Sequence, residues 1–251
     1  MISITTIIVM LVIGILGGFI SGLVGIGGAI VIYPALLLLP PLFGLPTYSA
    51  YIASGLTSSQ VFFSTLSGSL NAYKNKNFSR TLILNMGSGM VIGSMLGAIL
   101  ANLINVQFVN TVYIIALLAL ILMFIKVTPS TSHIKFNRLL LITIGGIIGL
   151  VSGIVGAGGA FIIIPVLLVI FKLPMNMVVT NSIVIAFISS IGAFMIKLLQ
   201  GYIPINSAIP LILGSILFTP LGMKMGQKIP DYIQKTIICI LIVIAIIKLI
   251  F

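Results

Sequence analysis

The segment GFISGLVGIGGAIVIYPALL, from Gly18 to Leu37, places a glycine cluster and a proline inside an apolar run. It recurs as GLVSGIVGAGGAFIIIPVLL from Gly149 to Leu168, with 12 of 20 aligned positions identical. Inside a helix, glycine costs about 1 kcal/mol relative to alanine and proline about 3 kcal/mol. Because both copies keep these costly residues, we expect each copy to interrupt its helix at the glycines.

The whole chain is strongly apolar. Its 251 residues are 60% hydrophobic and only 5% charged, against about 25% charged in typical soluble domains. Apolar runs longer than the roughly 20 residues of a membrane-spanning helix recur throughout. The sequence therefore predicts an all-α polytopic protein, multi-pass in the cell (plasma or inner) membrane. The first run lacks a basic flank and a cleavage site, so we expect it to be retained rather than removed as a signal peptide.

The few ionisable residues exclude several classes of function. The chain has one acid, Asp231, and one histidine, His133, and both lie in basic loop sequences. Metal sites, carboxylate pairs and catalytic triads need several such groups together. We therefore expect no enzyme activity, no metal, no cofactor and no proton relay through carboxylates inside the membrane. The net charge of +11 is scattered between apolar runs, unlike a nucleic-acid-binding face.

Eight apolar runs form two sets of four. They cover residues 4–39, 48–70, 81–104 and 108–125, then 139–171, 175–199, 203–223 and 232–251. We divide the chain into a first transmembrane repeat (1–126), a cytoplasmic linker loop (127–138) and a second transmembrane repeat (139–251). Runs 4–39 and 139–171 are too long for one crossing, because 36 helical residues reach about 54 Å against a hydrocarbon core of about 30 Å. Each should be broken or re-entrant.

The basic residues indicate an orientation, because short cytoplasmic loops collect Lys and Arg. Three loops should therefore lie inside: those with Lys74, Lys76 and Arg80, with Lys126, Lys135 and Arg138, and with Lys224, Lys228 and Lys235. The last two loops share a side only if run 139–171 enters and returns. The charge pattern is then reversed between the halves, which favours the inverted repeats of secondary transporters. Chance placement of the lysines is the alternative.

The glycine clusters are candidate anion-binding elements. New helices near Ala29 and Ala160 would begin with N–H groups that have no partner within the helix, at the positive end of a helix dipole. Such ends bind anions without basic side chains. The candidate backbone residues are Gly25, Gly27, Gly28, Gly156, Gly158 and Gly159. The alternative is close helix packing through small residues, which we expect for Gly89, Gly93 and Gly97.

Neutral side chains complete the candidate substrate site. Alignment of the two Leu-Pro pairs at 45–46 and 173–174 places Asn181 and Ser182 at the positions of Ala53 and Ser54. Hydroxyls and amides can bind an oxyanion, and they can equally join helices. We select Ser54, Asn181 and Ser182 as candidate substrate-binding residues. Lys197, near the end of run 175–199, is expected to extend to the membrane interface.

The duplicated SGxxGxGGA…P element, at Ser21–Pro34 and Ser152–Pro165, resembles the TauE/SafE family of sulfite and organosulfonate exporters. So do the TNS sequence at 180–182 and FFSTLSGSLNAYKNKNFSR at 62–80. The resemblance covers almost the whole chain. It implies a membrane permease that moves small sulfur-containing anions outward.

The same sequence features are compatible with transport of another small anion. A carrier or a channel for another small anion, such as sulfate, thiosulfate or an organic carboxylate, is the main alternative. The expected partners are a small anionic substrate and the lipid bilayer, without nucleic acid. The anion, the coupling ion, the transport direction and the oligomeric state stay open, with a homo-oligomer as one alternative.

Overall fold

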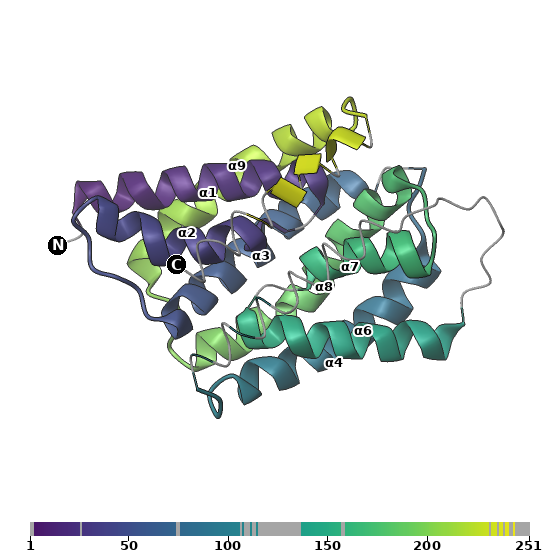
Figure 1. Cartoon of the computed structure of the whole chain (residues 1–251), viewed down its shortest axis with the longest axis horizontal. Coiled ribbons are helices and arrows are strands. Elements are labelled where there is room, and N and C mark those ends of the chain that lie inside the picture. Colours follow the sequence, from purple (N-terminus) through teal and green to yellow (C-terminus); the bar gives the residue numbers. More distant parts are fainter. Residues whose placement is uncertain are drawn as a thin grey trace.

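The computed structural model describes residues 3–25, 27–73, 76–105, 107, 111, 114, 137–156, 159–230, 232–234, 236–237, 239–240 and 243. This part of the chain is helical and contains no strand (Figure 1). Five of its helices are long and apolar enough to cross a membrane: α1 (Ile4–Val24), α4 (Arg80–Leu100), α6 (Arg138–Val155), α8 (Met175–Leu199) and α9 (Ile205–Gly226). The all-helical prediction is confirmed, and these helices support a multi-pass membrane protein.

Large aliphatic side chains cover the outer faces of these helices. Exposed examples are Leu16 of α1, Leu96 of α4, Ile147 of α6 and Leu217 of α9. A surface of this kind suits contact with lipid, where the solvent is as apolar as leucine.

Both glycine-rich runs are interrupted where the sequence predicts. In the first, α1 ends at Val24 and α2 (Ala29–Leu42) begins after Gly28. In the second, α6 ends at Val155, and α7 (Ala160–Pro165) follows Gly159 and continues as a π-helical turn, η1 (Val166–Ile170). Gly25, Gly28, Gly156 and Gly159 have φ between 76° and 79°. Only glycine adopts this left-handed conformation without a steric cost.

After the first break the chain turns back along α1. Gly28 lies against the carbonyl of Gly17, and the start of α1 and the end of α2 line one apolar cavity through Ile4 and Phe43. Helix α2 therefore runs antiparallel beside α1 (Figure 1). After the second break the chain also turns back, along α6, because Gly159 lies near Ser152 and Ile148 of that helix.

Two parallel helix pairs, α1 with α9 and α4 with α6, pack through glycines. Three glycines of α1 meet α9 and three of α6 meet α4, in the pairs Gly14–Leu211, Gly18–Ser215, Gly22–Thr219, Gly145–Met86, Gly149–Met90 and Gly153–Ser94. Within each helix pair the residue numbers rise together, so the two helices are parallel. Gly89, Gly93 and Gly97 lie against backbone of α6, which confirms the close packing expected for them.

Helices α3 (Ala50–Ala72) and α8 lie between these two pairs and connect them. Helix α3 crosses α8 in the opposite direction, because Gly55 meets Tyr202 near the end of α8 while Gly68 meets Ile183. It runs parallel to α9, as the hydrogen bonds Tyr48–Ser207 and Ser67–Ile216 show. Similarly, α8 runs parallel to α4: Ile188 packs against Gly87, and Gln200 bonds to Ala98.

The boundaries of the central runs agree with the sequence. Run 175–199 coincides with α8, and α3, α4 and α9 differ from their predicted runs by a few residues at each end. Several predictions lie outside the described residues: most of runs 108–125 and 232–251, the linker 127–136, Lys74, Lys126, His133, Lys135, Gly158, Asp231 and Lys235. The division into two repeats and a linker stays a prediction.

Candidate functional site

Each glycine break packs against a serine of the opposite half of the chain. A Cβ added at Gly25 would lie 2.9 Å from the hydroxyl oxygen of Ser182. A Cβ added at Gly156 would lie 2.6 Å from the hydroxyl oxygen of Ser54. Both serines are buried. The structure thus brings four of the candidate residues together, in two pairs of the same kind.

The hydrogen bonds at the breaks show which backbone groups are engaged. The N–H of Gly25 donates to the carbonyl of Ser21 at 2.8 Å, and that of Gly156 to Gly153 at 3.2 Å. The carbonyls of Gly28 and Gly159 accept bonds from the first turns of α2 and α7. Donors for a ligand would therefore have to come from residues after the first glycine of each break. Gly27 is among them, with φ 70° and a buried position.

Asn181 is buried but turned toward protein groups. Its amide nitrogen donates to the carbonyls of Asn77 and Met177, at 2.8 and 2.7 Å. Its amide oxygen accepts from the N–H of Ser79 at 2.8 Å. Asn181 therefore fastens the segment before α4 onto α8. The Ser182 hydroxyl likewise faces protein carbonyls, those of Gly25 and Val179, whereas the Ser54 hydroxyl has no hydrogen-bond partner among the described residues.

Gln60 of α3 belongs to the polar cluster of run 48–70 but was not selected from the sequence as a candidate site residue. It is fully buried, and neither atom of its amide has a hydrogen-bond partner among the described residues. Its amide nitrogen would lie 3.3 Å from a Cβ on Gly28, at the start of α2. Ile188 takes this position in the second half when the Leu-Pro pairs are aligned. A buried amide without partners costs about 1–3 kcal/mol and calls for a ligand or water. An amide at the end of the polar stretch Thr57–Gln60 was the available signal.

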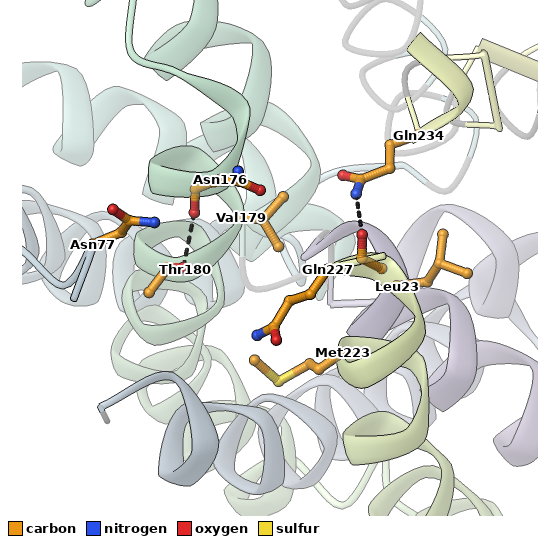
Figure 2. A pocket seen from close by; sticks show the side chains of 9 residues that line it. Leu23, Asn77, Asn176, Val179, Thr180, Met223, Gln227 and Gln234 are labelled. Atoms are coloured by element: carbon orange, nitrogen blue, oxygen red, sulfur yellow. Dashed lines mark hydrogen bonds between the residues drawn. The ribbon is translucent and has the colours of Figure 1, made fainter. Parts of the chain in front are cut away.

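A cavity of about 200 Å³ lies beside the first break (Figure 2). Nine residues from five segments line it. They are Leu23 of α1, Asn77 before α4, Asn176, Val179 and Thr180 of α8, Met223, Gly226 and Gln227 at the end of α9, and Gln234. In Figure 2, Asn176 and Thr180 lie across the cavity from Met223 and Gln227. Val179 also contacts Gly25, so the cavity adjoins the glycine break.

The chemistry of this cavity is neutral. Its polar lining consists of amides and one hydroxyl, and Thr180 donates that hydroxyl to the carbonyl of Asn176 at 2.8 Å. The amide oxygen of Gln234 is buried, with no hydrogen-bond partner in the part of the chain that the structure describes. Within the described ranges no cluster of His, Cys, Asp or Glu could hold a metal ion. Such a lining binds small ligands by hydrogen bonds, and the first turn of α8, which contains Asn176, adds positive potential. The sequence analysis missed Asn176 and Gln227 because they come from segment ends 51 residues apart.

Comparison with known proteins agrees with this architecture. The family model for the sulfite exporter TauE/SafE matches residues 10–249. The probable membrane transporter protein YunE of Bacillus subtilis is 25% identical over 95% of this chain and 94% of its own length. A probable membrane transporter protein of Methanocaldococcus jannaschii is 26% identical over 88% of this chain and 86% of its own length. No solved structure matches. Because the family model spans nearly all of the sequence, the chain belongs to the sulfite exporter TauE/SafE family.

Proposed function

We propose that this membrane transporter is a secondary carrier that exports small sulfur-containing anions, such as sulfite or organosulfonates, across the cell membrane. The observation that carries the proposal is the first glycine break, which adjoins a neutral cavity of about 200 Å³. Amide donors beside the N-terminus of α8 favour an anion over a cation. The family to which the chain belongs carries the name of sulfite exporters, which supports both the substrate and the direction.

The proposed substrate site lies at the two breaks. Backbone N–H groups around Gly25–Gly28, Gly27 included, bind the anion with Ser182, and those around Gly156–Gly159, Gly158 included, bind it with Ser54. The packing of Gly55 on Tyr202 and of Gly68 on Ile183 makes these two successive positions along the antiparallel helices α3 and α8. The hydroxyl of Ser54 is buried without a hydrogen-bond partner among the described residues, which leaves it available to a ligand. Asn181 keeps a place in the site as the residue that positions Asn77 on the cavity wall.

The two halves are proposed to form an inverted repeat. The contact of Gly25 with Ser182 has its counterpart in that of Gly156 with Ser54. Likewise, α1 packs on α9 as α6 packs on α4. Helices α1, α9 and α3 run in one direction, and α6, α4 and α8 in the other. An exchange of the halves therefore converts each contact into its partner and reverses the direction, as an inverted repeat requires.

Anion-dependent thermal stabilisation of the purified protein tests the function. A ligand at 100 times its Kd stabilises the folded state by about 2.7 kcal/mol. We expect sulfite or an alkylsulfonate to raise Tm more than sulfate or acetate at equal ionic strength. Stabilisation by a carboxylate or sulfate alone would favour the carrier of another anion. A protein that responds to none of them would contradict the proposal.

Transport kinetics separate the carrier from the channel. Flux through a carrier should saturate with anion concentration in proteoliposomes, because each cycle occupies one site. A conductance that rises linearly over the same range would favour a channel.

A further inference from the structure

Lys197 occupies a place that the sequence did not predict. It lies in the last turn of α8, where we expected its amine to reach the membrane interface. That expectation is wrong: Lys197 is 0% exposed, and its Nζ has no hydrogen-bond partner among the described residues. The described part of the chain also contains no acidic side chain, because the single acid of the sequence, Asp231, lies outside it. A buried, uncompensated charge in a membrane protein is costly and usually functional.

A pair of stacked tyrosines, Tyr202 and Tyr51, lies on one side of the Lys197 amine. Nζ lies 5.5 Å from the centre of the Tyr202 ring, which gives a cation–π contact. Tyr202 in turn stacks on Tyr51, with ring centres 5.5 Å apart and an interplanar angle of 19°. Tyr51 is fixed by its hydroxyl, which donates to the carbonyl of Ile104 at 3.0 Å. The rings hold the ammonium in place and leave its hydrogen-bond donors unused.

This aromatic pair borders the second glycine break. Ser54 and Gly55 are neighbours in α3: Ser54 contacts Gly156, whereas Gly55 contacts the backbone of Tyr202. The Ser54 hydroxyl and the Lys197 ammonium, two buried groups without hydrogen-bond partners among the described residues, are thus associated with one short stretch of α3. The cavity beside the first break begins at the other end of α8, near Thr180. By helical rise, Thr180 and Lys197 are about 25 Å apart.

We propose that Lys197 is an anion-binding residue, and that the transported oxyanion supplies the negative charge that the ammonium lacks. The inference rests on the proposed function. It adds a positively charged anion-binding position at the end of α8 that is remote from the neutral cavity. A purely structural role explains the residue poorly, because an apolar side chain of equal length would fill the space without burying a charge. Ser69, which aligns with Lys197 in the first half, is neutral. The charged position therefore occurs in the second half, at the end of α8, and has no charged counterpart at Ser69 of α3.

The test compares Lys197→Met, which keeps the length and removes the charge, with Lys197→Arg, which keeps the charge. Lys224→Met, in the exposed last turn of α9, is the matched control. The apparent Kd of the purified full chain for sulfite and methanesulfonate is measured by thermal stabilisation, and Tm is also measured without ligand. We expect Lys197→Met to raise Kd about 30-fold or more, as loss of one member of a buried charge pair does. Its ligand-free Tm should equal or exceed that of the wild type. Lys197→Arg should bind more tightly than Lys197→Met, and Lys224→Met should bind as the wild type does.

Two results would overturn the inference while leaving the proposed function in place. One is a Lys197→Met variant that binds both anions with the wild-type Kd. The other is a variant that no longer folds or purifies, because a charge that awaits a ligand should be dispensable for folding. A wild-type protein that responds to no anion would instead contradict the proposed function, and this inference with it.

Discussion

Ser182 donates its hydroxyl to the carbonyl of Gly25 at 3.1 Å, across 157 positions of the sequence. The bond joins α8 to the point where α1 ends, inside the protein. A side chain at Gly25 would crowd this hydroxyl and would also oppose the left-handed backbone at φ 78°. The break in α1 and the contact between the two halves therefore depend on the same glycine.

Replacement of Ser182 by alanine tests this contact. Loss of one buried hydrogen bond should lower the free energy of unfolding by about 1 kcal/mol. If Ser182 also binds the anion, the stabilisation by sulfite should fall as well. Ser190→Ala is the control, because the Ser190 hydroxyl bonds within α8, to the carbonyl of Phe187, and to no other described residue. Equal sulfite responses in the two variants would remove Ser182 from the site.

The shape of the first break can be tested at Gly28 with Gly44 as the comparison. Both have a left-handed backbone, with φ 76° and 70°, so Ala at either position carries a conformational cost of about 1–2 kcal/mol. A Cβ at Gly28 would lie 2.5 Å from the carbonyl oxygen of Gly17, whereas one at Gly44 meets nothing within 4 Å. Gly28→Ala should therefore lower Tm more than Gly44→Ala and weaken anion binding. Equal effects would mean that the break tolerates a side chain.

The breaks were predictable from the sequence because their causes are local. Run 4–39 is too long for one crossing, and glycine is the residue at which a helix most readily ends, so the helix starts at Ala29 and Ala160 followed from composition and length. The burial of Lys197 and Gln60 was not predictable. In a helix that is apolar on all sides, periodicity does not tell which face meets protein and which meets lipid. The environment of Lys197 depends on how other elements pack around the end of α8, where Tyr51 of α3 stacks on Tyr202.

Orientation in the membrane gives a further prediction. Asn77 and Gln227 line one cavity, so the basic segments around Lys76 and Lys228 lie at the same end of the protein. The excess of Lys and Arg there predicts the cytoplasmic side. In a Cys239→Ser background, Lys76→Cys and Lys228→Cys should react with a membrane-impermeant thiol reagent only from the cytoplasm, and Asn105→Cys only from outside. Labelling of the first two from opposite sides would end the inverted-repeat proposal.

The driving force for export gives the last prediction. The described helices hold no carboxylate that could carry a coupled proton, so the membrane potential is the expected source of energy. Moving one negative charge out of a negative interior releases about 2.3 kcal/mol per 100 mV, which corresponds to a concentration ratio of about 50. Methanesulfonate efflux from proteoliposomes should accelerate when a potassium-diffusion potential makes the lumen negative. Taurine, a sulfonate whose ammonium group cancels its charge, is the matched control and should respond little. If methanesulfonate efflux is also independent of the imposed potential, a co-transported ion must balance the charge, and the potential-driven mechanism is wrong.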